Sequence, residues 1–457
     1  MTGKRPATGE TQTGHFVDCI LKIRYEDLPP AAIEVSKQVM LDGLGVTVAG
    51  ADEPSGIGRI AKQYAQDMGG APESTVITGG FKTSMSMAAF VNGTLNHALD
   101  FDNTWYPMNH PTSPTLPAIL AVAEKHKFSG RQVIEAIVTA FEVQGRIRLA
   151  ATGWGIGKGF HKPGVTGIMG ATAAVAKLLG LNRHQLLMAF GLAGSRAGGL
   201  SVNTGTMTKS SHSGQAARSG VECAVLASMG WTATDDIFGP DGLLDAFTGT
   251  DNKPELLTEG FGDPYRMVSP GVGFKKYPSS YATHRSIDAA LALRAESGIA
   301  AADIKHVTIV FPDWSHVSRP KPESGLDGKF SVQYVTALAL LDGEVTIGSF
   351  TDARRFAPDV EDLLSRVELV VDRNIPADMD TMYTEVQVTL KNGKKFAKTT
   401  RELSGWVGQP LHPDRIAAKF FGCVRDRLEE SRASRVADLV QGLEKQPDIC
   451  GILEHLR

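Results

Sequence analysis

The amino-acid sequence predicts a mainly α-helical protein, in which a large all-helical domain built from both chain ends carries a smaller inserted α+β lid domain. Apolar residues recur with helical spacing from about residue 15 to 270, alternate with strand spacing only after 270, and return to helical spacing from Pro413. A chain of 457 residues is also long for one core, so two domains are expected. We place the domain boundaries at 1–270, 271–404 and 405–457.

The helices of the first part are predicted from their apolar stripes and their ends. Residues 30–46 follow paired prolines, which suit the first turn of a helix. Gly180 and Gly230 end apolar segments, where glycine supplies a left-handed cap. Residues 164–171 interleave glycine with larger side chains, which lets neighbouring helices approach closely. We expect further helices at 83–99, 113–126, 130–149, 165–179, 183–192 and 211–229.

The inserted part is predicted from alternating apolar residues. Residues 304–311, 367–371 and 385–390 each alternate as half-buried strands do. The third strand runs into Asn392-Gly393, the turn of a tight hairpin. Helical spacing separates these strands, so the domain is α+β. The two expected helices are 281–296 and 330–341.

Composition and charge exclude several classes of protein. A 42% hydrophobic and 21% charged composition is that of a globular chain, and a net charge of −3 gives no reason to expect a nucleic-acid or membrane partner. No apolar stretch approaches the roughly 18 residues that a bilayer span needs. The four cysteines are isolated in sequence, and the polar segment 1–14 is unlike a secretory signal. We therefore expect a soluble, cytoplasmic protein.

Two glycine-rich stretches resemble nucleotide-binding loops only superficially. Residues 153–159 follow a helical pattern rather than a strand, and residues 205–210 lack the glycine that precedes the lysine of a phosphate loop. No cysteine or histidine pair has the spacing of a zinc site. We expect neither an organic cofactor nor a metal.

Residues 96–111 concentrate titratable side chains at a junction between two predicted helices. They include Asp100, Thr104 and His110, with a second aspartate, a second histidine and aromatic residues beside them. Burying such groups is costly without a purpose. Helix capping is the simpler explanation for a single aspartate, whereas the whole cluster favours a functional site. Prolines on both sides of His110 restrict its backbone and so direct its imidazole.

A second cluster lies at residues 205–214. Serines 210 and 211 are expected to open a helix, whose free N–H groups attract anions, and Lys209 and His212 share one side at a spacing of three. The alternative is a solvated helix start with a surface lysine.

A third cluster contains Lys275, Lys276 and Ser280, at the border of the two predicted domains, where clefts form. A lysine pair alone is usually a solvated face. His161 stands apart, and the sequence favours a structural and a functional role for it equally.

Together these clusters supply aspartate, threonine, histidine and lysine side chains. Chemistry at a carbon beside a carboxylate develops enolate-like charge, so it needs fixed cations around that carboxylate and one group that moves a proton. The clusters therefore predict an enzyme that acts on a small anionic carboxylate by side-chain acid–base chemistry.

The same three segments resemble the MmgE/PrpD family, which includes 2-methylcitrate dehydratase, cis-aconitate decarboxylase and iminodisuccinate epimerase. The resemblance spans roughly residues 15–445. It is carried by His-Ala-Leu-Asp-Phe-Asp at 97–102, Gly-Thr-Met-Thr-Lys at 205–209, Lys-Tyr-Pro-Ser at 276–279 and Leu-Leu-Asp-Gly at 340–343. It implies a homodimer whose cofactor-free active site lies in the cleft between a helical domain and a lid.

Residue by residue, the resemblance implies an active site that contains Asp100, Thr104, His110 and Lys209. It matches further positions at His161, Tyr334 and one of two adjacent lysines. With the cluster residues added, the predicted substrate-binding set is His161, His212, Lys275, Lys276, Ser280 and Tyr334.

We expect a lyase that eliminates water or carbon dioxide from a small di- or tricarboxylic acid. Lys209, His110 and the expected helix start hold substrate carboxylates, His110 or Asp100 moves a proton at carbon, and Thr104 positions the leaving group or Asp100. The spacing from 104 to 110 resembles the decarboxylase, yet Tyr106 and Ser280 stand where the decarboxylase has histidines.

Two alternatives stay open. The Thr-Met-Thr-Lys and Tyr-Pro-Ser patterns resemble the epimerase branch, which favours epimerisation of a substituted succinate. A catalytically inactive carboxylate-binding homologue is the other alternative.

Overall fold

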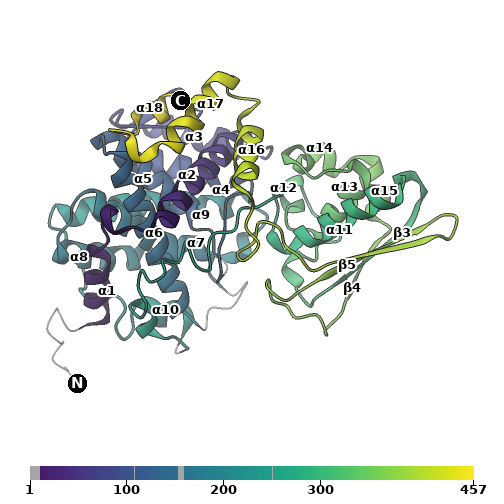
Figure 1. The fold of residues 1–457 in the computed structure, drawn as a ribbon, viewed down its shortest axis with the longest axis horizontal. Helices are drawn as coiled ribbons and strands as arrows, with labels where there is room; N and C mark the ends of the chain where they lie inside the picture. The colour runs from purple at the N-terminus through teal and green to yellow at the C-terminus, as the bar shows by residue number, and fades with distance from the viewer. Residues whose placement is uncertain (1–10, 108, 153–158, 250) are drawn as a thin grey trace.

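The protein is mainly helical, as predicted, in a computed structural model that describes residues 11–107, 109–152, 159–249 and 251–457. Figure 1 shows a large helical body beside a smaller part, with both chain ends on the body. The rejected nucleotide loop at 153–159 lies outside the described residues except for Gly159, as do residues 1–10 of the polar N-terminal segment.

The predicted helices of the body are confirmed, with their ends shifted by a few residues. They are α2 (Pro30–Gly50), α4 (Met85–Ala98), α5 (Thr112–His126), α6 (Gly130–Ala150), α7 (Lys162–Leu178), α8 (Arg183–Arg196) and α9 (Met207–Ser228). Helices not individually predicted are α1 (Gln12–Leu21), α3 (Ile57–Met68) and α10 (Leu243–Thr248). The C-terminal return forms α16 (Pro413–Val424), α17 (Glu430–Gln441) and α18 (Cys450–Glu454), and a two-stranded ribbon pairs β1 (Ser74–Thr75) with β2 (Lys82–Thr83).

The start of α9 corrects one prediction. The helix begins at Met207, four residues earlier than expected, after an extended Thr206 and a Gly205 at φ 97°. Ser210 and Ser211 therefore lie inside the first turns and do not open an anion site. The hydroxyl of Ser210 donates to the carbonyl of His97 instead.

The smaller part contains a four-stranded sheet in the order β4-β3-β5-β6. Its predicted hairpin is confirmed, with Gly393 in the left-handed region between β5 and β6. The crossover from β3 to β4 makes that pair parallel. Helices α11, α13 and α15 lie over one side of the sheet (Figure 1). The elements are α11 (Tyr281–Ser297), β3 (Ile304–Phe311), α12 (Gly325–Gly328), α13 (Val332–Asp342), α14 (Asp352–Arg355), α15 (Pro358–Leu364), β4 (Val367–Val371), β5 (Thr384–Leu390) and β6 (Lys395–Thr400).

Two large hydrophobic cores follow this arrangement. One runs from Phe16 to Phe274 and resumes from Ile416 to Leu456, and the other runs from Tyr277 to Trp406. Both chain ends therefore build the helical body, while 270 and 404 remain predicted boundaries. Among the described residues, no helix combines the length and apolar character that crossing a membrane requires, and the four cysteines form no disulfide.

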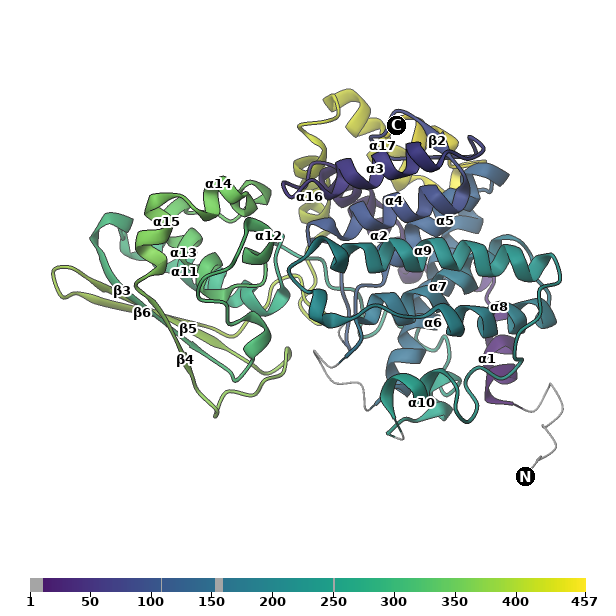
Figure 2. The same ribbon diagram turned by 180° about the vertical axis from the view of Figure 1, so that it is seen from behind.

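Glycines bring α4 and α9 close together. Figure 2 shows α9 running beside α4 and α7 across the back of the body. A Cβ atom on Gly214 would lie 2.2 Å from Oγ1 of Thr94 and 2.4 Å from the carbonyl oxygen of Phe90, both on α4. The close approach matters because the end of α4 and the start of α9 carry His97 and Lys209.

Gly214→Ala is therefore expected to lower the free energy of unfolding by about 1–3 kcal/mol, through overpacking. Gly422→Ala is the matched control, because Gly422 is helical and exposed, and its Cβ meets nothing within 4 Å. Alanine there should raise the free energy by about 0.5–1 kcal/mol. Thermal unfolding followed by circular dichroism measures both changes. Equal shifts in the two variants would contradict the packing argument.

Candidate active site

A cavity of about 490 Å³ lies where the loop after α4, the start of α9, residues 275–281 and the segment before α13 meet. Seven of the ten predicted site residues line it. They are Asp100, Thr104, His110, His161, Lys209, Lys275 and Ser280.

Asp100 stands between two lysines in the wall of the cavity. Its carboxylate oxygens each accept a hydrogen bond of 2.6 Å, one from Nζ of Lys209 and the other from Nζ of Lys275. The Asp100 side chain is 5% exposed and Lys275 is 1% exposed. Burial alone would raise the pKa of Asp100, but the two ammonium groups hold it well below its usual value. Asp100 is thus a fixed anion that orients two cations.

His97 and His110 share the second carboxylate of the loop, Asp102. Nδ1 of His97 lies 2.9 Å from Oδ1 of Asp102, and Nε2 of His97 accepts from Nζ of Lys209 at 2.8 Å. Burial lowers the pKa of His97 to about 4, so this ring is neutral and donates through Nδ1. Nδ1 of His110 lies 3.2 Å from Oδ2 of Asp102 and 3.1 Å from the carbonyl of Asn103. A continuous chain of polar contacts therefore joins Asp100 to His110.

His161 and His212 form a pair behind this chain. Their Nδ1 atoms are 3.1 Å apart, so one ring donates to the other. Burial lowers the pKa of His212 to about 4 and that of His161 well below its usual value, and Lys209 adds to both shifts. Both rings are uncharged at neutral pH. His161 reaches the cavity wall, whereas His212 supports it from outside and does not supply the predicted positive charge.

The hydrogen bonds of Thr104 and Ser280 are made mainly with backbone carbonyls of neighbouring segments. The hydroxyl of Thr104 donates to the carbonyl of Asn109, and its backbone pairs with Gly273, so Thr104 shapes its own loop and does not contact Asp100. Ser280 precedes α11 and donates its backbone N–H to Lys329.

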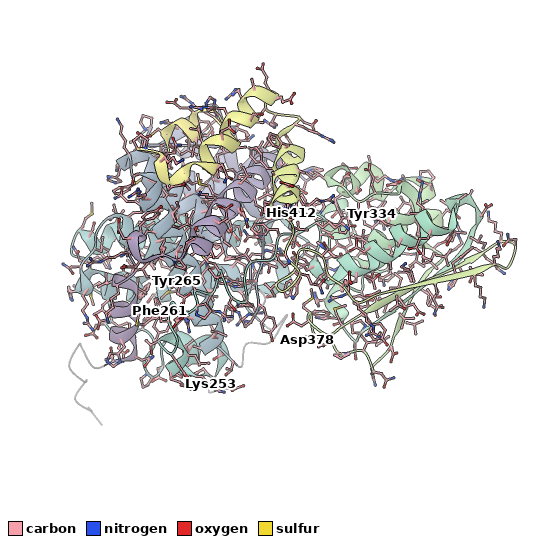
Figure 3. The ribbon with its side chains drawn as sticks, in the orientation of Figure 1. Lys253, Phe261, Tyr265, Tyr334, Asp378 and His412 are labelled. Carbon is pink, nitrogen blue, oxygen red and sulfur yellow. The ribbon has the colours of Figure 1, made fainter. Side chains whose placement is uncertain are left out.

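Lys276 and Tyr334 do not line this cavity, although both were predicted to bind substrate. Nζ of Lys276 binds Asp288 on α11 at 2.7 Å. The hydroxyl of Tyr334 donates to the carbonyl of Ser349 at 2.6 Å, within the smaller part (Figure 3). Each side chain satisfies a partner on the side away from the cavity.

Several residues in or beside the cavity were missing from the predicted set: Lys162 and Arg319 line it, and His97 and Asp102 bind residues that do. His97 and Asp102 stand in the motif at residues 97–102. A prediction that included every histidine and aspartate of that motif would have contained both. Lys162 follows His161 directly, and burial lowers its pKa to about 7. Arg319 comes from the smaller part, pairs with Asp327, and lies with its guanidinium 5.4 Å from the centre of the Phe330 ring. No sequence motif marked Arg319.

The same loop holds the one metal-ligand set found among the described residues. Donor atoms of His97, Asp102 and His110 lie within 4.8 Å of one another. Nδ1 of His97 and Nδ1 of His110 both face the Asp102 carboxylate, at 2.9 Å and 3.2 Å.

Two sequence profiles match the chain. The MmgE/PrpD N-terminal domain matches residues 14–256, and the MmgE/PrpD C-terminal domain matches residues 277–445. Cis-aconitate decarboxylase from Mus musculus is 33% identical over 97% of this chain and 93% of that protein. Cis-aconitate decarboxylase from Aspergillus terreus is 28% identical over 94% and 93%, and 2-methylcitrate dehydratase from Escherichia coli (strain K12) is 27% identical over 79% and 78%.

These matches confirm the resemblance drawn from the sequence motifs. The profiles leave out only the chain ends and a short join, and the named activities of the relatives are lyase reactions at carbon. This chain therefore belongs to the MmgE/PrpD family, as a lyase of that family's type.

Proposed function

We propose that this lyase removes carbon dioxide from a small unsaturated tricarboxylic acid, with cis-aconitate as the first candidate. The observation that carries the proposal is the pair of ammonium groups, from Lys209 and Lys275, fixed by Asp100 in the wall of the cavity. The likeness to cis-aconitate decarboxylases over nearly the whole chain supports decarboxylation over dehydration.

The chemistry explains why fixed cations are useful. When a carboxylate leaves as carbon dioxide, the electron pair of the broken carbon–carbon bond moves through the neighbouring double bond onto a remaining carboxylate. A proton must then be added at carbon. Ammonium groups that already point at that carboxylate stabilise the developing charge without reorganising. Lys209 and Lys275 take this role, with Lys162 and Arg319 beside the other carboxylates.

His110 is the proposed proton donor. Its Nδ1 faces two acceptors, Asp102 and the Asn103 carbonyl, so Nδ1 carries a hydrogen and Nε2 is the atom that gains and loses the proton. Asp100 is unsuited to this task, because both its oxygens are bound and its pKa is low.

We also propose a homodimer in the cytoplasm, without metal or organic cofactor, in line with the family resemblance. The smaller part acts as a lid in this proposal. Phe330 supports that role, because its ring lies 5.2 Å from Nζ of Lys209 and so places the smaller part directly over the lysine.

Incubation of the purified protein with cis-aconitate, citrate, 2-methylcitrate and substituted succinates in deuterated water tests the reaction. Cis-aconitate is expected to lose one carboxyl group and gain one carbon-bound deuteron, and dialysis against EDTA should leave the rate unchanged. Mass spectrometry of the products measures the loss of the carboxyl group, the gain of deuterium and the rate before and after dialysis. Water loss from 2-methylcitrate alone would identify a dehydratase instead. Deuterium exchange without loss of carbon dioxide or water would identify an epimerase. Activity that is lost on dialysis and restored only by a divalent ion would contradict metal independence.

Lys209→Met is expected to lower kcat/KM by about 10- to 100-fold, the loss of roughly 1.5–3 kcal/mol that a charge-assisted hydrogen bond contributes. Lys276→Met is the matched control, because Lys276 forms an ion pair outside the cavity. Its kinetics should stay close to wild type. A similar loss in both variants would point to a general charge effect rather than a contact with substrate.

His110→Asn is expected to melt normally but to lose about 100-fold or more in kcat, since general acid catalysis contributes about that factor. His184→Asn, at an exposed position on α8, serves as the control. Steady-state kinetics and thermal unfolding separate the possibilities. A lower melting temperature with unchanged specific activity would assign His110 a structural role.

A further inference from the structure

Hydrogen bonds to its backbone carbonyls hold the end of α4 and the loop that follows it. Carbonyls at a helix C-terminus have no partner within the helix and carry partial negative charge. Here three lysines from other segments supply the partners. Nζ of Lys329 donates to Ala98 at 3.1 Å, Nζ of Lys275 to Asp100 at 2.6 Å, and Nζ of Lys419 to Phe101 at 2.7 Å.

Each of these ammonium groups is also paired with a carboxylate. The pairs are Lys329 with Glu53 at 2.9 Å, Lys275 with Asp100 at 2.6 Å and Lys419 with Asp42 at 2.7 Å. All three lysine side chains are at most 7% exposed. A paired lysine costs less to bury than a lone one, and it keeps further N–H groups for a carbonyl.

Lys419 differs from Lys275 in that it does not line the active cavity. It comes from α16, in the C-terminal return, and reaches the residue between the two loop aspartates. Besides the carbonyl bond, its Nζ lies 3.9 Å from the centre of the Phe101 ring. Two contacts with one residue fix both the backbone and the side chain of Phe101.

We propose that Lys419 is a positioning residue of the reaction, which holds Phe101 so that Asp100 and Asp102 keep their catalytic partners in place. Asp100 orients Lys209 and Lys275, and Asp102 orients His97 and His110, so a shift at Phe101 moves both groups. A misplacement of about 1 Å at a reacting group costs about 100-fold in rate. The kinetic part of this inference rests on the proposed function, whereas the structural part does not.

The simple variant Lys419→Met leaves Asp42 buried without its counter-ion, which threatens folding. The double variant Asp42→Asn/Lys419→Met removes both charges together, and with them both contacts of the ammonium group with Phe101. We expect its melting temperature to stay close to wild type while kcat falls by about 10-fold or more and KM changes by less than about threefold. Lys419→Arg should recover most of kcat, because a guanidinium reaches both Asp42 and the carbonyl.

Glu135→Gln/Lys177→Met is the matched control. Lys177 likewise pairs with a carboxylate, at 3.1 Å, and donates to a backbone carbonyl, that of Ile23, at 2.7 Å, but neither partner belongs to the loop after α4 or to the cavity wall. This control should keep its kcat. An equal fall in both double variants would show that the loss is general and would overturn the proposal.

Hydrogen exchange at residues 99–107 gives a second readout that needs no substrate. Exchange there should accelerate in the Asp42/Lys419 double variant and stay unchanged in the control. Unchanged exchange, or accelerated exchange with wild-type kcat, would mean that Lys419 only neutralises Asp42 and would overturn the proposal. If no carboxylic acid is turned over by the wild type but exchange accelerates as expected, the positioning role stands and the proposed function fails.

Discussion

The ion pairs of Asp100 with Lys209 and Lys275 are the interaction on which the rest of the site depends. Burying two ammonium groups this deeply costs free energy unless nearby negative charge compensates them. The Asp100 carboxylate between the two lysines and the Asp102 carboxylate on the same loop supply that charge. Balance also keeps the lysines from turning toward solvent. The cavity wall therefore carries preorganised cations, as the proposed anionic substrate requires, and the surrounding fold has to keep these groups in position.

The fold meets that demand by bringing distant segments to one loop. Glycine contacts set α4 against α9, so that His97 and Lys209 meet although they are far apart in sequence. The smaller part contributes Lys329, and the C-terminal return contributes Lys419. Lysines from the inserted part and from the C-terminal return thus bind carbonyls of the loop after α4. Because the helical body is built from both chain ends, its C-terminal part can help to position a site carried by its N-terminal part.

The sequence predicted most of the fold and the centre of the site, because helical spacing and clustered polar residues are local signals. Lys275 and Lys276 show the limit. Neighbouring side chains point to different sides of the chain, and only the tertiary structure decides that Lys275 meets Asp100 while its neighbour meets α11. The start of α9 was misplaced for a similar reason, because Gly205 and Thr206 supply the turn without a capping hydrogen bond. Arg319 lies in no motif, so its arrival at the cavity depends entirely on packing.

The two histidines on Asp102 have the same tautomer but different capacities for proton transfer. In each ring Nδ1 faces oxygen acceptors and so carries the hydrogen, which leaves Nε2 to react. Nε2 of His97 accepts from the Lys209 ammonium, and protonation there would place two cations in contact within a buried wall. Burial and that neighbour together oppose the charged ring, in agreement with a pKa of about 4. The contacts of His110 within the described residues run through Nδ1, and its ring lines the cavity. Of the two imidazoles, that of His110 therefore fits the proposed proton transfer better.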